Sequence, residues 1–155
     1  MNNHFERTSE KINVDDLQSF EKSLKIKLPE DFKEHYLKYN GGIPDNKCFY
    51  MQAFDTFVEI SRFFSIKNVD DKGQKIEDVY TNLAIKQNIL QPHYLPFAKD
   101  WGGNLFCINL KLNDIFILYL DMGTVENGSI RFLTRGFENF IEMLEKCEDD
   151  EEDED

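Results

Sequence analysis

The stretch from Leu28 to Gly42 constrains the fold more than any other part of the chain, because it encodes a helix together with both of its ends. Pro29 suits the first helical position, where its missing N–H is not needed, and acidic residues follow it at the positive end of the helix dipole. Aromatic residues recur at helical spacing, at Phe32, Tyr36 and Tyr39. Gly41 and Gly42 can adopt the positive φ that closes a helix. The pattern predicts a helix from about Pro29 to Asn40.

A second amphipathic segment precedes this helix. Its apolar positions are Leu17, Phe20 and Leu24. Asn13, followed three residues later by Asp16, has the spacing of a helix N-cap. The sequence therefore predicts a helix from about Val14 to Leu24.

Together the two segments resemble the start of the SUKH superfamily, which includes the fungal Smi/Knr cell-wall regulators and many bacterial toxin-immunity proteins. The family pattern is an amphipathic helix ending in Phe-Glu (here Phe20-Glu21), a short link, Leu-Pro, a second helix and Asn-Gly-Gly. Many members have glycine in the link, where this chain has residues 25–27, Lys-Ile-Lys. Residues 95–104 resemble a second family signature, an apolar-Pro-Phe-Ala run followed by Gly-Asn that leads into a strand. The resemblance implies that the motif residues determine the fold: Leu28, Pro29, Asn40, Gly41, Gly42, Gly103 and Asn104.

The remaining pattern predicts mostly strands. Aromatic and β-branched runs over 48–54 and 57–64 favour a β-hairpin, and a helix is expected from about Ile76 until before Pro92. Apolar runs over 105–110 and 115–120, around the turn residues Asn113-Asp114, favour a second hairpin of central strands. A strand over 129–134 and a final amphipathic helix from Phe137 complete the chain. The fold class predicted is α+β, one domain in which flanking helices pack on an antiparallel-rich sheet, and the resemblance implies the same.

Length and composition predict one compact domain. The chain has 155 residues, of which 41% are hydrophobic, which suits a single core. We place this SUKH-like domain at residues 13–147, after a polar lead-in over residues 1–12 that we expect to be flexible. The sequence has no basic start followed by an apolar run and no apolar stretch long enough to span a bilayer. We therefore expect a cytoplasmic protein.

The negative charge is concentrated in residues 148–155. The net charge is −12, and without these residues 22 acidic side chains face 18 basic ones, a balance of −4. A block of like charges favours a disordered tail that aids solubility; it is also compatible with an electrostatic arm for a basic partner, or with weak calcium binding. Direct binding to nucleic acid or anionic membranes is disfavoured. The tail residues kept as candidate partner contacts are Glu148, Asp149, Asp150, Glu151, Glu152, Asp153, Glu154 and Asp155.

The residues able to perform catalysis or bind metal are few and scattered. The histidines His4, His35 and His93 have no metal-binding spacing. The three cysteines, Cys48, Cys107 and Cys147, are an odd number without a Cys-x-x-Cys pair, which favours reduced thiols in an intracellular protein. We predict no catalytic residues, no metal site and no cofactor.

The loop that follows Lys99 has two interpretations. Gly102, Gly103 and Asn104 can form a tight connection that serves only backbone geometry. Alternatively, Asp100 and Trp101 present an exposed recognition surface, because tryptophan is enriched among residues that dominate binding energy. The first interpretation is favoured on frequency, and Asp100 and Trp101 are kept as candidate partner contacts.

The resemblance implies a binding protein rather than an enzyme. Our hypothesis is an immunity protein that neutralises a cognate protein toxin, in particular a basic nuclease domain, by covering its active-site surface. The alternative is a regulatory or scaffold module of the Smi/Knr type.

Overall fold

The computed structural model describes residues 3–68, 73–120 and 130–147. The elements in these ranges are, in chain order, β1 (Phe5–Glu6), α1 (Val14–Leu24), α2 (Glu30–Lys38), β2 (Ile43–Pro44), β3 (Cys48–Met51), the 3₁₀ turn η1 (Gln52–Phe54), β4 (Thr56–Phe63), α3 (Ile76–Tyr80), its π-helical continuation η2 (Thr81–Lys86), β5 (Tyr94–Asp100), β6 (Leu105–Asn109), β7 (Asp114–Leu118), β8 (Ile130–Arg135) and α4 (Phe137–Met143). None of the helices in these ranges is long and apolar enough to cross a membrane.

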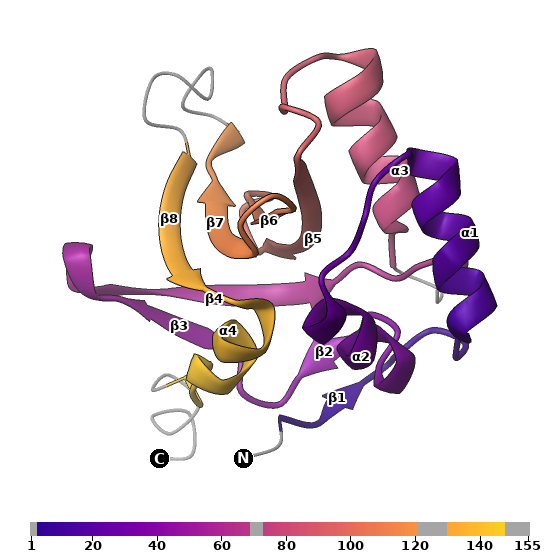
Figure 1. The fold of residues 1–155 in the computed structure, drawn as a ribbon. Coiled ribbons are helices and arrows are strands. Elements are labelled where there is room, and N and C mark those ends of the chain that lie inside the picture. Colours follow the sequence, from indigo (N-terminus) through magenta and orange to yellow (C-terminus); the bar gives the residue numbers. More distant parts are fainter. Residues whose placement is uncertain (1–2, 69–72, 121–129, 148–155) are drawn as a thin grey trace.

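Strands β3 to β8 form one antiparallel sheet in which each strand pairs with the one before it. The sheet is strongly curved: β3 and β4 extend as a long arm, while β5 to β8 turn upward from it (Figure 1). Register shifts within the β4–β5, β5–β6 and β7–β8 pairs mark irregularities of the kind that bend strands. The α+β class with an antiparallel sheet, predicted from the sequence, is confirmed.

Helices α2 and α4 pack against one face of the sheet through aromatic rings. Phe32 of α2 and Phe137 of α4 lie 4.7 Å apart between ring centroids. Phe137 and Phe140 also contact Phe97 of β5, at 5.1 and 5.7 Å. All four rings are fully buried. Burying side chains of this size stabilises the fold by about 1.5–3 kcal/mol each, and this cluster is the centre of the core.

The N-terminal segment contributes to the core through a small second sheet. Strand β1 pairs antiparallel with β2, with Phe5 opposite Pro44. Phe5 is buried, and its ring lies 4.9 Å from that of Phe63. Ile12 is buried as well. The lead-in over residues 1–12 that we expected to be flexible thus contains two core residues.

Helix α1 forms as predicted, from Val14 to Leu24. The Asn13 side chain accepts a hydrogen bond from the Asp16 N–H, and the Asp16 carboxylate accepts one from the Asn13 N–H, which is a complete capping box. After the helix, Lys25 has φ +59°. A lysine therefore adopts the left-handed conformation in the link where many SUKH members have glycine. The turn forms here without a glycine.

The second family signature forms a strand itself, which the sequence analysis missed. Residues 94–100 are β5, a central strand, and the Gly-Asn that follows is the turn into β6. Pro96 has no N–H to donate to a ladder, and the register shifts between Pro96 and Ala98. Proline is tolerated within sheets at such irregularities, which explains why a central strand can contain it.

Candidate functional site

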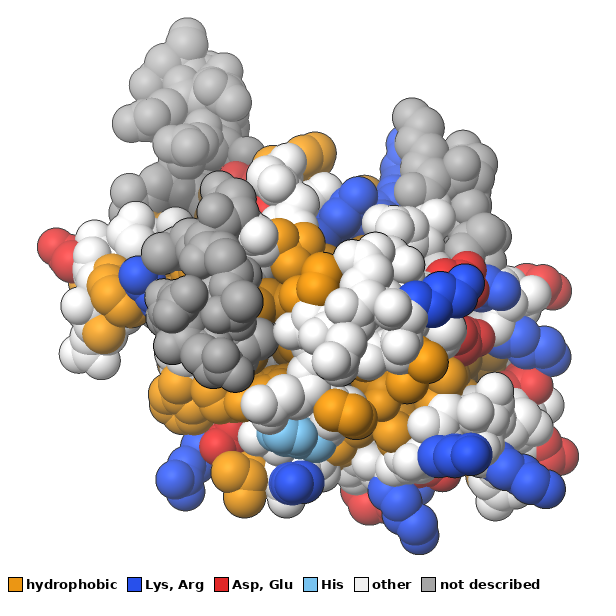
Figure 2. All heavy atoms as spheres, turned by 90° about the horizontal axis from the view of Figure 1, so that it is seen from above, with side chains coloured by type: hydrophobic (Ala, Val, Ile, Leu, Met, Phe, Trp, Pro, Cys, Tyr) orange, Lys and Arg blue, Asp and Glu red, His pale blue; other side chains and the backbone are white. Residues whose placement is uncertain are grey.

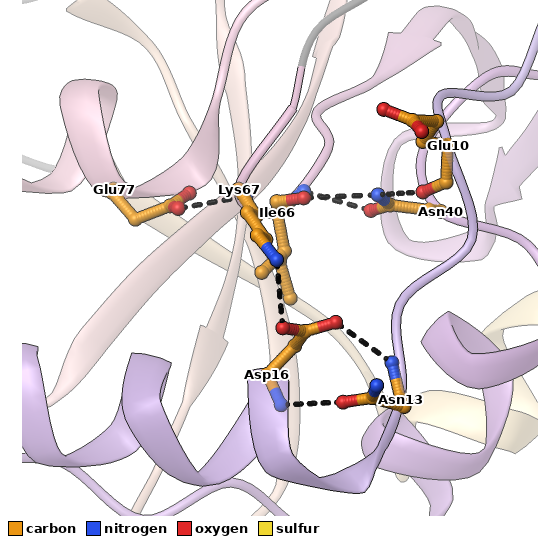
Figure 3. A network of polar contacts seen from close by, with 7 residues as sticks. All are labelled: Glu10, Asn13, Asp16, Asn40, Ile66, Lys67 and Glu77. Carbon is orange, nitrogen blue, oxygen red and sulfur yellow. Dashed lines mark hydrogen bonds and ion pairs between the residues drawn. The ribbon is translucent and has the colours of Figure 1, made fainter.

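Asn40 lies where the chain leaves α2, and it is almost completely buried. Its amide nitrogen donates to the carbonyls of Glu10 at 2.8 Å and Ile66 at 2.9 Å, and its oxygen accepts from the Ile66 N–H at 2.7 Å (Figure 3). Its backbone carbonyl accepts from the N–H of Ser9 at 2.9 Å. One side chain thereby ties the end of α2 to the segments before α1 and after β4, which is a structural role.

Gly41 and Gly42 allow three backbone segments to approach each other. Both have positive φ, +76° and +101°. A Cβ on Gly41 would lie 3.0 Å from the Phe64 carbonyl oxygen, and one on Gly42 would lie 2.6 Å from that of Glu6. Any other residue would force β1 and the end of β4 away from this corner.

Lys67 extends this network to α1 and α3. Its ammonium group lies 3.0 Å from Asp16 Oδ1, and its backbone N–H donates to Glu77 Oε2 at 2.7 Å (Figure 3). The Asn13 N–H, and then Lys67, lower the pKa of Asp16. Burial raises the pKa of Glu77. The polar contacts in Figure 3 thus hold the loop after β4 between two helices.

Three motif residues, Glu21, Leu28 and Pro29, shape the link between α1 and α2. The Leu28 N–H donates to Glu21 Oε2 at 2.7 Å, and the Leu28 side chain is buried. Pro29 has φ −61° immediately before α2, which its ring favours. The Glu21 side chain therefore holds the link between the end of α1 and the start of α2 in place.

The turn between β5 and β6 is organised by Asp100. Its Oδ1 accepts from the N–H groups of Gly102 at 2.9 Å and Asn104 at 2.8 Å, and its Oδ2 accepts from the Asn104 amide at 3.1 Å. Gly103 has φ +89° with open space at its Cβ position. The carboxylate of Asp100 thus serves the turn, which agrees with the first interpretation of this loop.

Trp101 is a large hydrophobic residue of this turn, and it is 70% exposed. Its indole N–H donates to Glu59 Oε2 of β4 at 2.9 Å, so the ring is anchored while remaining accessible. The tail residues 148–155 lie outside the described residues. Asp100, Trp101 and the tail remain the predicted partner contacts.

The prediction of reduced thiols is wrong for two of the three cysteines, because Cys48 and Cys147 form a disulfide with a Cα–Cα distance of 5.3 Å. Glu145 exchanges two backbone hydrogen bonds with Cys48, which brings the end of the domain alongside β3. This approach depends on tertiary structure, and residue spacing does not reveal it. Disulfides persist in oxidising compartments, so the cytoplasmic location, which rested partly on reduced thiols, stays a prediction.

The remaining candidates for chemistry have structural surroundings. Burial raises the pKa of the Cys107 thiol, as expected for an inert core cysteine. Part of His35 reaches the surface, but its Nε2 is fully buried, and desolvation followed by the charge of Lys38 lowers its pKa to about 4. Among the described residues, His4, Glu6 and Asp45 place possible metal ligands close together, but all three are exposed. Exposed acidic groups are common in proteins without a metal ion, so this group alone does not identify a metal site.

An open cleft of about 880 Å³ lies between α3–η2 and the β5–β6 end of the sheet. Lys75, Lys86 and Lys99 are among its lining residues, together with Glu77. Seen from above, hydrophobic side chains gather in the middle of the molecule and most charged ones lie toward its rim (Figure 2). Trp101 is not among the residues that line the cleft.

The curved antiparallel sheet, the Leu-Pro link and the Asn-Gly-Gly corner define an α+β domain of the SUKH class. The sequence matches the model of the SMI1/KNR4 family (SUKH-1) over residues 11–145. The match covers most of the chain, and the protein therefore belongs to this family. A comparison with curated proteins found no match.

Sequence reasoning did not anticipate Glu59 as the partner of Trp101, nor that Tyr50 pairs with Phe57 further along the β3–β4 pair. The alternation of exposed and buried residues in β4 contained part of this signal, since Phe57 and Glu59 are separated by the buried Val58. Pairing with β5 and the Trp101 turn could not be read from that alternation.

Proposed function

We propose that this protein is a non-enzymatic immunity protein that binds and neutralises a cognate protein toxin. Its membership of the SMI1/KNR4 (SUKH-1) family carries the proposal, because the resemblance implies this role for many bacterial members. The partner that suits the chain best is a basic toxin, and within that class a nuclease domain.

The charge of the chain supports a basic partner. The net charge is −12, and residues 148–155 contribute eight of the negative charges. A nuclease must bind polyanionic nucleic acid, so its active-site cleft is basic and attracts an acidic protein over a long range. Such steering chiefly raises the association rate and makes it sensitive to salt. Inhibition would then be steric and electrostatic.

Three polar groups that were candidates for chemistry or recognition are used by the fold. The side chains of Asn40 and Asp100 are bonded within the chain. The Cys107 thiol is buried in β6 and has a raised pKa. These groups stabilise the fold, which leaves the surface to provide recognition.

The test is co-expression with the toxin domain encoded beside this protein, scored first by rescue of growth. Co-purification at about 50 and about 500 mM salt then measures the electrostatic share of binding, because screening is strong at the higher concentration. We expect rescue and a complex that weakens at high salt. Absence of both rescue and complex would contradict the proposal.

A second candidate function is a regulatory or scaffold module. The matched family is named after SMI1/KNR4, and the resemblance implies a regulatory role for the fungal Smi/Knr members. A module of this kind would purify with cellular proteins when no toxin gene is present. An immunity protein would bind the neighbouring toxin and rescue growth, so the co-expression test separates the two.

A further inference from the structure

Helices α2 and α4, which pack against each other (Figure 1), enclose an open hollow of about 210 Å³. Four of its lining residues are acidic, Asp31 and Glu34 of α2 and Glu138 and Glu142 of α4. We call it the acidic hollow. Pockets for small-molecule ligands usually measure about 300–1,000 Å³. The size of the acidic hollow therefore suits a single side chain of a partner protein.

The two walls of the acidic hollow are held in position by the fold. The rings of Phe32 and Phe137 lie 4.7 Å apart between centroids. Asp31 Oδ2 accepts a hydrogen bond from the backbone N–H of Glu138 at 3.1 Å, and the same carboxylate accepts from the Asn113 amide at 3.3 Å. Asp31 thus joins the two helices, and the other three carboxylates are left for binding.

The carboxylates of Glu34, Glu138 and Glu142 are exposed, and they make no hydrogen bond or ion pair with the described part of the chain. Glu138 and Glu142 are four residues apart, which places them on one face of α4. Lys38 is the single basic residue of the lining, and its ammonium group lies 5.4 Å from the centre of the Tyr39 ring. Four acidic residues and one basic residue give the hollow a formal charge of −3.

A buried nitrogen beside the acidic hollow lacks a hydrogen-bond partner. His35 lines the hollow, and its Nε2 is fully buried without a hydrogen bond to any described residue. Burial, and then the charge of Lys38, lowers the pKa of His35 to about 4, so its ring is neutral at pH 7 and does not repel a cation. Buried polar atoms are nearly always paired, and a neutral imidazole has one accepting nitrogen. This unpaired nitrogen is a second indication, independent of the carboxylates, of a missing donor.

An organic cation fits the acidic hollow better than a metal ion. The described sets of three possible metal ligands within 4.8 Å of one another lie elsewhere in the structure. The carboxylates of the hollow therefore do not converge closely enough in threes to share one ion, and Ca²⁺ takes about 6–8 oxygen ligands. A guanidinium group spreads five N–H donors over a planar fork. It can pair with carboxylates on two separate walls.

We infer that the acidic hollow receives an arginine side chain of a partner protein. Its guanidinium group pairs with Glu34 on one wall and with Glu138 and Glu142 on the other, so the charges are complementary. Its methylene stem packs against Tyr39 and Ile141, which also line the hollow. The identification of that partner as a toxin rests on the proposed function.

The test is a titration of N-acetyl-arginine amide into the full-length ¹⁵N-labelled protein, followed by amide chemical shifts. We expect saturable changes in residues 34–38 and 138–142. The matched ligand N-acetyl-citrulline amide has nearly the same shape without the charge, and it should bind at least about tenfold more weakly. Equal binding of the two ligands, or changes confined to residues 148–155, would overturn the inference. Tighter binding of Ca²⁺ at the same amides would also overturn it, because the hollow would then be a metal site.

Two variants remove a carboxylate from opposite walls while keeping the shape of the side chain. Glu34→Gln and Glu142→Gln should each weaken binding of the arginine derivative about threefold. The matched control is Glu145→Gln, because Glu145 is exposed just beyond α4 but does not line the hollow. It removes the same charge and should bind like the wild type. Equal weakening by all three substitutions would contradict a specific site, since only the overall charge would matter.

The toxin domain provides a second, distinguishable test. If the wild type rescues growth and the double substitution Glu34→Gln with Glu142→Gln lowers the affinity for the toxin at least about tenfold, both proposals hold. If the wild type rescues growth while the double variant binds equally well, the inference is wrong and the immunity role stands. If the wild type neither binds nor rescues, the proposed function fails, and the arginine titration alone decides the hollow.

Discussion

The Asn40 corner and the Trp101 surface use polar and aromatic residues in opposite ways. At the corner, Asn40 is buried and its amide bonds only to the backbone of this chain. The Trp101 surface comprises Trp101, Glu59, Phe57 and Tyr50. Trp101 and Phe57 are exposed there; Trp101 bonds to Glu59, and the Phe57 ring contacts that of Tyr50. The comparison teaches that the family motif specifies the fold, and that recognition is to be sought in residues outside the motif.

The largest expected effect is that of Asn40→Ala. The substitution leaves the buried N–H and C=O of Ile66 without their partner, and each unsatisfied buried group costs about 1–3 kcal/mol. We expect the free energy of unfolding to fall by about 3–5 kcal/mol in urea denaturation. A loss below about 1 kcal/mol would show that the corner does not hold the fold.

Gly42→Ala should have the second-largest effect on stability. Its Cβ would lie 2.6 Å from the Glu6 carbonyl oxygen at φ +101°, and we expect a loss of about 2–4 kcal/mol. Gly103→Ala is the matched control, because its φ is +89° but nothing lies within 4 Å of its Cβ position. It should cost about 1 kcal/mol for backbone strain alone. Equal losses in thermal denaturation would mean that the close approach of β1 is unimportant.

The lowered pKa of His35 predicts that the stability of the protein depends on pH. Its folded pKa of about 4 lies below its ordinary value of 6.5, so the neutral form is favoured by folding. This contribution is complete above pH 6.5 and is lost as the pH falls toward 4. Between pH 7 and pH 5, His35 should lower the free energy of unfolding of the wild type by about 2 kcal/mol. His35→Phe places a ring among those of Phe5, Phe63 and Phe137, and its free energy of unfolding should fall much less over this pH range. If the free energies of unfolding of the two proteins changed in parallel with pH, the prediction would be contradicted.

The smallest expected effect on stability is that of Trp101→Ala. The side chain is mostly exposed, and such substitutions usually change stability by less than about 0.5 kcal/mol. A small change in the free energy of unfolding, measured by urea denaturation, together with weakened partner binding, would support a role of Trp101 in recognition rather than in the fold. A loss above about 2 kcal/mol would place Trp101 with the fold residues instead.

Local sequence patterns predicted the elements whose signals are local. The bounds of α1 follow from its capping box and apolar spacing, and the two hairpins follow from their apolar runs and turns. Strand β5 was missed because Pro96 argues against a central strand, and the irregularity that accommodates it depends on pairing with β6. The motif residues could be identified in advance, but not the backbone groups that Asn40 binds.

The Trp101 surface was only partly predictable. The exposure of Trp101 belonged to the less favoured of the two interpretations of its loop. Its neighbours Glu59 and Phe57 come from β4, and the disulfide joins residues 99 positions apart. Such proximity arises from sheet pairing and chain closure, which no local pattern encodes.

Hydrogen exchange of the full-length protein, with and without the neighbouring toxin domain, tests the central claim most directly. The account predicts new protection of amides in residues 50–59 and 100–104 or in residues 138–142 of α4, and unchanged exchange around Asn40. New protection around Asn40, with the β3–β4 arm and α4 unaffected, would contradict it.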